Sequence, residues 1–378
     1  MRAFGRRRAG NAALAAAVLG AGALVVAVAI AALAGADVMA PYLVALLCWA
    51  TIPIGALGML ITYQLIGGAW GLVLGDVAAA ASRTLPLIAL LVLPIFIFQA
   101  DLYPWHRPEV MAEARVAAKA GYLDATFFTI RGVGYLIVWV GLGVLLAWGE
   151  GALVRRPRLR AIAAIGAILY VLSVTFAAVD WAMSLEPKFA SSAYGWIFLT
   201  DALIAGLAFS ICAVALLGRD AEGRNPFGEG ETRVLSGALL GCILFWTYIV
   251  FMQYLVIWSG DLPDSVAWYQ ARVGGGWTPV VWAIGLLHAA LPFLVLLSPR
   301  ARANWRILTA LAAVVLAMRF VHIVWLVLPA FGEQGWIQVP LAVCALIGIG
   351  GLWLGLFLWT LPASRDRVMV GAERLRHG

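Results

Sequence analysis

The chain has 378 residues, of which 64% are hydrophobic and only 12% are charged. A soluble domain carries about 25% charged residues, so this composition excludes an ordinary soluble protein and indicates a membrane protein. The apolar runs are continuous, which excludes a membrane β-barrel because barrel strands alternate apolar and polar residues. The net charge of +7 does not indicate nucleic-acid binding, because the basic residues are dispersed over the segments between apolar runs.

Ten apolar runs are long enough to cross a bilayer as helices, which takes about 20 residues each. The first run, Asn11 to Ala34, is longer than the roughly 7–15 residues of a signal-peptide core, so we expect a retained helix. The predicted spans are residues 11–34, 41–66, 83–100, 124–148, 159–183, 192–217, 233–258, 276–297, 304–328 and 336–361. We therefore predict an all-α polytopic membrane protein, with residues 1–378 forming a single integral membrane domain.

The order of the spans suggests two sets of four helices. Helices 2–5 (residues 41–183) and helices 6–9 (residues 192–328) begin on the same side, so we interpret them as two four-helix bundles flanked by helices 1 and 10. Most of the 26 lysines and arginines fall in segments on one side of the membrane. Because basic loops stay in the cytoplasm, this asymmetry predicts that both termini are cytoplasmic.

Two segments on the predicted outer side are rich in aromatic residues and turns. One runs from Asp101 to Leu123, and the other extends from Trp258 through Trp268 to Trp277. Tryptophan and tyrosine are enriched where a membrane protein meets the interface. The segments are therefore either interfacial anchors or a docking surface for an extracytoplasmic partner.

Six ionisable residues fall inside the predicted spans. Arg319 and His322 are three residues apart, so they share one helix face. The others are Arg131, Asp180, Asp201 and His288. At 1.5 Å per residue, Asp201 and Arg319 lie about 13 Å below the outer face. The other half of the membrane offers only Thr62, Tyr63, Gln64 and scattered hydroxyls.

Charges at membrane depth are costly, so these side chains are expected to face the protein interior and to pair. We predict two ion pairs, Arg131 with Asp180 and Arg319 with Asp201. Histidine carries protons near neutral pH. His322 and His288 therefore favour a proton path or quinone site open to the outer face, and the alternative is that these polar groups only hold helices together.

Resident redox centres are not expected. Cys48, Cys212, Cys242 and Cys344 lie in apolar runs without a C-x-x-C spacing, which argues against an iron–sulfur site or a disulfide framework. Two membrane histidines are too few for a di-haem subunit, and no metal-ligand spacing is found in the outer segments.

Several longer motifs resemble a known family. They are Asp101-Leu102-Tyr103-Pro104-Trp105, residues 127–131 (FFTIR), residues 174–187 (VTFAAVDWAMSLEP), residues 257–263 with Trp268-Tyr269, residues 287–293 (LHAALPF) and Met318-Arg319. In this order, over roughly residues 40–330, the chain resembles the F subunits of alternative complex III, the bacterial quinol:electron-acceptor oxidoreductase. Those subunits belong with the polysulfide-reductase-type (NrfD-like) membrane proteins.

This resemblance implies a ten-helix subunit of an electron transport chain in the bacterial inner membrane. The implied partners are a related membrane subunit, an extracytoplasmic iron–sulfur subunit and c-type cytochrome subunits. Haem c and iron–sulfur clusters would then reside in the partners, and the present chain would supply a proton path, with menaquinone as a candidate ligand. The family pattern often has an acidic residue after the Met-Arg pair, where this chain has His322.

Two other classes of function remain open at this point. A secondary transporter would use a midplane site between proline-broken helices, with access from both faces. A structural scaffold would need no proton path at all.

Overall fold

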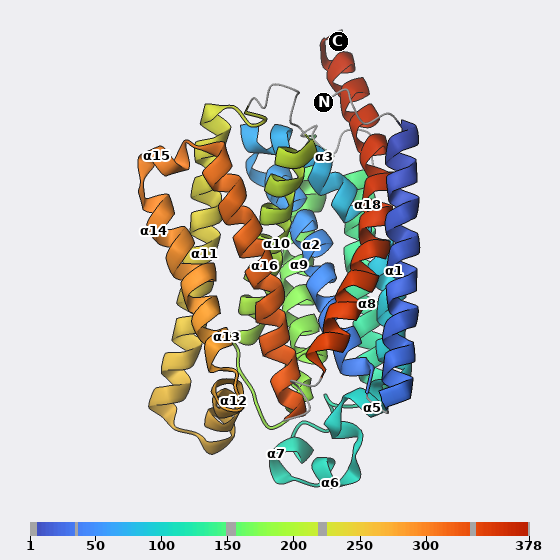
Figure 1. Cartoon of the computed structure of the whole chain (residues 1–378), viewed down its shortest axis with the longest axis vertical. Helices are drawn as coiled ribbons and strands as arrows, with labels where there is room; N and C mark the ends of the chain where they lie inside the picture. The colour runs from blue at the N-terminus through green and yellow to red at the C-terminus, as the bar shows by residue number, and fades with distance from the viewer. Residues whose placement is uncertain (1–5, 35–36, 149–155, 218–224, 333–337, 377–378) are drawn as a thin grey trace.

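The computed structural model describes residues 6–34, 37–148, 156–217, 225–332 and 338–376. Within these ranges the chain is helical and contains no strand. Among the described residues, ten helices are long and apolar enough to cross a membrane, which confirms the predicted all-α polytopic fold class. They stand side by side, with the start of the first and the end of the last at the same end of the bundle (Figure 1). We call this the termini end, and the opposite end the loop end.

The spans follow one another with short connections. They are α1 (Arg6–Ala34), α2 (Met39–Ile66), α3 with α4 (Ala69–Ser82 and Leu85–Ile97), α8 with the π-helical η2 (Ala125–Gly143 and Val144–Trp148), α9 with η3 (Pro157–Trp181 and Met183–Leu185), α10 (Tyr194–Leu217), α11 (Glu229–Gly260), α13 with the π-helical η4 and α14 (Thr278–Ala283, Ile284–Ala290 and Leu291–Leu297), α16 with η5 (Trp305–Val327 and Leu328–Phe331) and α18 (Val339–Arg376). The termini-end connection between α14 and α16 contains α15 (Pro299–Arg302).

Short helices cap the loop end. They are α5 (Gln99–Leu102), η1 (Pro104–His106), α6 (Pro108–Met111) and α7 (Ala114–Ala117) in one segment, and α12 (Pro263–Val273) in the other. These are the two aromatic segments singled out in the sequence. Proline opens η1, α6 and α12, where its missing N–H costs nothing because the first N–H groups of a helix have no intrahelical partner.

The third span begins earlier than predicted. Its hydrophobic helix extends over Ala69–Ile97 instead of starting at residue 83. The two parts of the span, α3 and α4, meet at Arg83 and Thr84, and Arg83 is buried rather than lying in a loop. The Arg83 guanidinium donates to the backbone carbonyl of Ala147 at the end of η2, from Nε at 2.9 Å and Nη2 at 2.5 Å. The polar residues Asp76 and Arg83 interrupt the apolar run, so the sequence predicted the start of this span too late.

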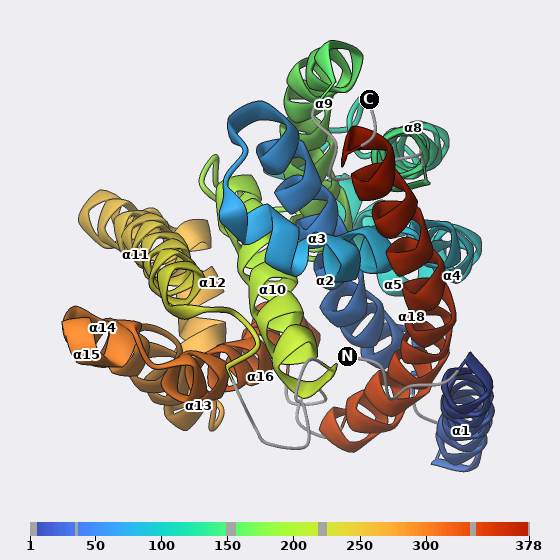
Figure 2. The same ribbon diagram turned by 90° about the horizontal axis from the view of Figure 1, so that it is seen from above.

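Two glycines allow helices α2 and α10 to cross closely at the centre of the bundle, a contact that we call the glycine crossing. Helices α2 and α10 are the most deeply buried spans and pack directly on each other (Figure 2). A Cβ on Gly55 would lie 1.7 Å from the carbonyl oxygen of Ala202, and one on Gly206 would lie 2.5 Å from the backbone nitrogen of Ala56. Small residues let membrane helices approach this closely, and the contact fixes the backbone next to Asp201.

The remaining helices pack around this pair in two groups. Helices α4, α8 and α9 pack near α2, with α9 also contacting α10, while α11 and α16 pack near α10 and the α13–η4–α14 span packs on α11 and α16. The groups correspond in range to the predicted bundles at 41–183 and 192–328. The division itself stays an interpretation, because α2 and α10 belong to one continuous core.

The first and last spans form the edge of the molecule. Helix α1 makes its main contact with α18. The two backbones meet at Gly20 and Gly351, where an added Cβ would fall within 3 Å of the partner helix. The four cysteines are free thiols; Cys48 is buried and the others are partly exposed on their helices.

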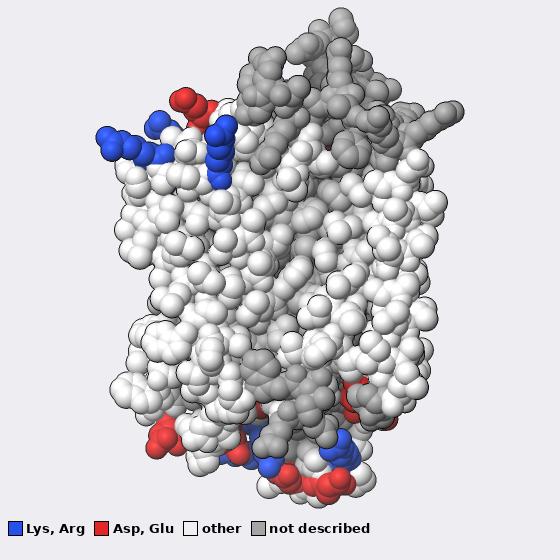
Figure 3. Space-filling model, viewed as in Figure 1, with Lys and Arg blue, Asp and Glu red and all other residues white. Residues whose placement is uncertain are grey.

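Charged side chains lie at the two ends of the face shown in Figure 3, and a broad band without exposed lysine, arginine, aspartate or glutamate separates them. This band matches the apolar girdle that a bilayer requires, since exposed charges there would be costly. The architecture therefore places the protein in a lipid membrane as a multi-pass protein.

The glycine crossing generates the first prediction. Gly206→Leu should destabilise the folded protein by about 1–3 kcal/mol, because the added side chain would force α2 and α10 apart. Thermal unfolding in detergent measures the loss. Gly237→Leu is the matched control, because a Cβ at that α11 position meets nothing within 4 Å. Equal melting temperatures for the two variants would contradict a close α2–α10 contact.

Candidate functional site

A buried triad of ionisable residues lies between α10 and α16. Asp201 comes from α10, and Arg319 and His322 come from one face of α16. The exposed fractions of the three residues are 0%, 0% and 1%. Asn304 precedes α16, and its side chain caps the helix by accepting from the backbone N–H of Arg306. The apolar residues of α16 pack against neighbouring helices, so Arg319 and His322 lie in the protein core.

The three side chains contact one another. Asp201 and Arg319 form the predicted ion pair through Oδ1 and Nη1. His322 Nδ1 lies 2.8 Å from Arg319 Nη1 and 3.1 Å from Asp201 Oδ2. The histidine therefore touches both members of the ion pair through one ring nitrogen, a contact that sequence spacing did not predict.

This single nitrogen makes the triad sensitive to protonation. When Nδ1 carries no proton, it accepts a hydrogen bond from Arg319. When Nδ1 is protonated, it donates to Asp201 and can no longer accept from the guanidinium. The proton on Nδ1 thus decides which neighbour the ring contacts, and with Nδ1 protonated the Asp201 carboxylate stabilises the imidazolium that forms when Nε2 takes up a second proton.

His288 lies close to the triad but does not join it. Its ring and that of His322 both pack edge-on against Trp246 of α11, with centroid distances of 4.4 Å and 5.1 Å. His288 is fully buried within η4, a π-helical turn, and neither ring nitrogen forms a side-chain hydrogen bond among the described residues. Such turns often occur at functional sites.

An apolar cleft of about 280 Å³ leads to the triad. His322 and Trp325 form its inner wall, and Tyr254 and Tyr269 lie nearer the loop end. The other lining residues are Trp246, Thr247, Val250, Phe251, Val273, Val281, Ile284, Gly285 and Ala289. We call this space the cleft. Since Nδ1 is occupied by Arg319 and Asp201, Nε2 is the ring nitrogen of His322 that is available to a ligand in it.

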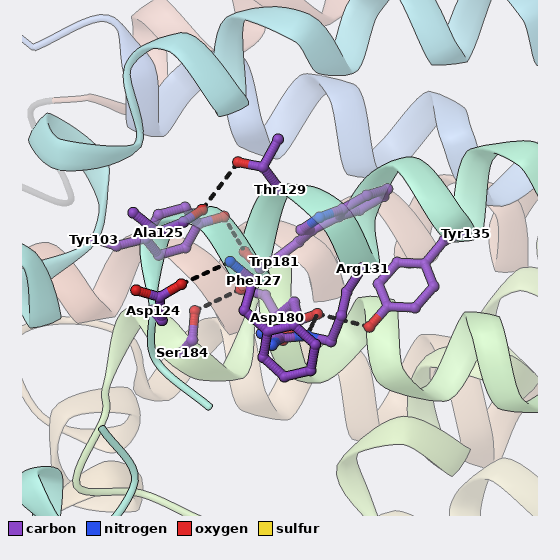
Figure 4. A network of polar contacts seen from close by, with 10 residues as sticks. All are labelled: Tyr103, Asp124, Ala125, Phe127, Thr129, Arg131, Tyr135, Asp180, Trp181 and Ser184. Carbon is purple, nitrogen blue, oxygen red and sulfur yellow. Dashed lines mark hydrogen bonds and ion pairs between the residues drawn. The ribbon is translucent and has the colours of Figure 1, made fainter. Parts of the chain in front are cut away.

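The second predicted ion pair, in the other helix group, is also present. Arg131 of α8 donates from Nε and Nη2 to the two oxygens of Asp180 of α9, each at 2.9 Å (Figure 4). Tyr135 adds a third hydrogen bond to Asp180 at 2.7 Å. The Arg131 guanidinium also lies over the rings of Tyr122 and Phe127, at 3.9 Å and 4.2 Å.

These contacts make the Arg131–Asp180 pair a clamp between α8 and α9. The bidentate arginine and the tyrosine hydroxyl together donate three hydrogen bonds to the Asp180 carboxylate. Asp124 caps the start of α8 by accepting from the backbone N–H of Phe127, which fixes the same helix. The cleft is not lined by any residue of this pair.

Arg272 is a buried residue that sequence reasoning assigned to an outer loop. Its side chain is 1% exposed and donates to Glu186 at 2.5 Å and to the carbonyl of Leu326 at 2.7 Å. The guanidinium lies 3.7 Å from the ring of Trp268, and the indole of Trp325 donates to the Arg272 carbonyl. Arg272 thus fastens α12 to the end of α16, beside the cleft. Its position outside the apolar runs concealed this role.

Ion pairs also hold the segment Asp101 to Leu123 against α12 and against the residues that follow η3. Arg115 pairs with Asp264 at 2.5 Å, and Lys188 pairs with Glu113 at 2.6 Å, which raises the pKa of the lysine. Lys119 donates to the carbonyl of Pro187 at 2.7 Å, and partial burial lowers its pKa. The segment Asp101 to Leu123 is therefore held against α12 and the end of α9.

No protein-family model matches the sequence, and no curated protein matches it either.

The clamp generates the second prediction. Asp180→Ala should destabilise the protein by about 3–5 kcal/mol, because it leaves the Arg131 charge without its carboxylate in a largely buried position. Thermal unfolding in detergent measures the loss. The double variant Arg131→Leu/Asp180→Leu should recover most of the stability, since it removes both charges. A double variant as unstable as Asp180→Ala would contradict the assignment of a charge-pair clamp.

Proposed function

We propose that this chain is a membrane subunit of a bacterial quinol:electron-acceptor oxidoreductase, of the alternative complex III type, that lines a proton path and a quinone site while carrying no redox centre itself. The supporting observation is the opening of the apolar cleft onto the Asp201–His322–Arg319 triad. The sequence motifs described above support the same class.

The chemistry of a quinol suits this arrangement. A quinol has an apolar tail and a polar ring whose oxidation releases two protons and two electrons. An apolar cleft between membrane helices accepts such a molecule, and a few polar groups at its inner wall orient the ring. Electrons must leave for a partner, because this chain supplies no group to hold them in the proposed scheme.

Each member of the triad has a distinct part in the proposal. In the tautomer whose Nδ1–H donates to Asp201, the bare Nε2 of His322 accepts a proton from a quinol hydroxyl, as a general base positioned at the inner wall. Asp201 stabilises the resulting imidazolium through Nδ1. Arg319 holds the carboxylate in place through the ion pair. His288, on the other side of Trp246, extends the polar region toward the membrane midplane.

The loop end supports the assignment of partners. It presents charged and aromatic segments held in a fixed shape by the ion pairs of Arg115 and Lys188. We propose that these segments face the extracytoplasmic side, with both termini in the cytoplasm and the chain in the inner membrane. There they would contact an iron–sulfur subunit and c-type cytochromes, while a related membrane subunit packs laterally.

The third prediction tests the triad. In the purified complex, His322→Ala should lower quinol turnover about 10²-fold or more, because the general base is lost. The assay is steady-state quinol oxidation with a soluble electron acceptor. Ile168→Ala is the control, since Ile168 of α9 is exposed on the side of the bundle and does not line the cleft. Its turnover should stay within twofold of the parent.

Purification of the native complex supplies the complementary measurement. Co-purification with haem c and iron–sulfur proteins is expected. Full turnover in an assembled His322→Ala complex would contradict the proposed proton path and would favour the structural-scaffold alternative. Solute uptake by the isolated chain in proteoliposomes would instead favour a secondary transporter.

A further inference from the structure

Gln253 is a buried polar residue in an apolar stretch of α11, and the site described above does not use it. Its exposed fraction is 5%. It lies seven residues, or two helical turns, after Trp246, on the same side of the helix and about 10 Å nearer the loop end. A buried amide within a membrane span requires partners, and here these are named side chains.

The Gln253 amide joins two other elements. Its oxygen accepts a hydrogen bond from the hydroxyl of Ser191, just before α10, at 2.7 Å. Its nitrogen donates to the hydroxyl of Tyr269, on α12, at 3.3 Å. The amide is therefore held more firmly by Ser191 than by Tyr269.

These contacts lie between two spaces. On one side is the cleft, which Tyr269 lines together with His322. On the other is a hollow of about 290 Å³, which Gln253 and Ser191 line together with Ser265 and Gly260. We call it the loop-end hollow. The Gln253–Tyr269 contact joins a residue that lines the loop-end hollow to one that lines the cleft.

We propose that Gln253 is a gate through which protons pass from the cleft to the loop-end hollow. This inference rests on the proposed proton path through His322 and names its exit. A proton taken up by the His322 imidazole has to reach solvent before the next turnover. Tyr269, Gln253 and Ser191 lie in succession between the cleft and the loop-end hollow.

The geometry indicates how the gate opens. The long contact to Tyr269 breaks first, and the amide turns about its firmer bond to Ser191. Water then connects the two spaces, and the imidazolium N–H bond of His322 breaks as a new O–H bond forms on a water molecule. Neutral imidazole is regenerated, and the proton leaves as hydrated proton on the loop-end side.

Tyr269 remains a neutral hydroxyl during these steps. Partial burial raises the pKa of Tyr269, although the hydrogen bond from Gln253 and the charge of Arg272 oppose that shift. A neutral hydroxyl can accept from Gln253 when the gate is closed and can donate to water when it is open. It therefore serves as a contact for the gate and does not store the proton.

A purely structural role makes a different prediction, because Gln253 would then only tie α11 to the start of α10 and to α12. In that case any substitution that removes the amide should damage the protein in the same direction. A gate instead predicts opposite effects on turnover for two kinds of substitution. An apolar side chain that fills the place of the Gln253 amide blocks water, whereas a small side chain leaves the passage between the two spaces open. The choice of substitutions therefore distinguishes the two roles.

The fourth prediction tests the gate in the intact complex by quinol turnover in H₂O and D₂O. Gln253→Leu should lower turnover at least tenfold and enlarge the solvent isotope effect, because an apolar side chain of similar size blocks water. Gln253→Ala should retain at least half of the turnover, with an isotope effect no larger than that of the parent. Leu244→Ala should keep turnover within twofold of the parent and is the control, because Leu244 is an exposed residue of the same helix that lines neither space.

Quinone binding separates a blocked exit from a damaged site. Quenching of tryptophan fluorescence by an added quinone should give dissociation constants within twofold of the parent for both Gln253 variants. Equal losses of turnover in the Leu and Ala variants, or loss of assembly in both, would overturn the gate. Full turnover in Gln253→Leu alongside loss in His322→Ala would overturn the gate alone, whereas full turnover in His322→Ala would overturn the proton path itself.

Discussion

The ion pair between Asp201 and Arg319 imposes the strongest constraint on this molecule. Both side chains are fully buried, and removing charges from water costs several kcal/mol for each unless they are paired. Helices α10 and α16 must therefore keep a fixed distance and rotation. The glycine contact of α10 with α2 and the latch of Arg272 at the end of α16 hold those helices from opposite sides.

The two charge clusters show how similar residues can have different roles. Asp180 is enclosed by Arg131 and Tyr135, so its pair joins α8 to α9 without facing the cleft. Asp201 shares its arginine with a histidine whose ring borders the cleft. A carboxylate–arginine pair alone thus indicates packing. The added imidazole, with an accessible second nitrogen, turns the same pair into a candidate proton carrier.

Much of the fold could be predicted from sequence because length and apolarity specify membrane spans almost directly. The pairing of Arg131 with Asp180, and of Arg319 with Asp201, followed from the cost of isolated charges. The predicted start of the third span was wrong because Asp76 and Arg83 interrupt its apolar run. Arg272 and Gln253 were missed for a different reason: their importance depends on contacts with helices distant in sequence, which periodicity does not reveal.

The contact between α1 and α18 has a consequence for biogenesis. Among the described spans, α1 precedes the others along the chain and α18 follows them, yet α18 is the main partner of α1. During synthesis α1 must therefore remain in lipid on its own while eight other spans assemble. A chain that stops before α18 would therefore lack the glycine-lined contact at Gly20 and Gly351, and would leave α1 without its main partner and open to membrane quality control.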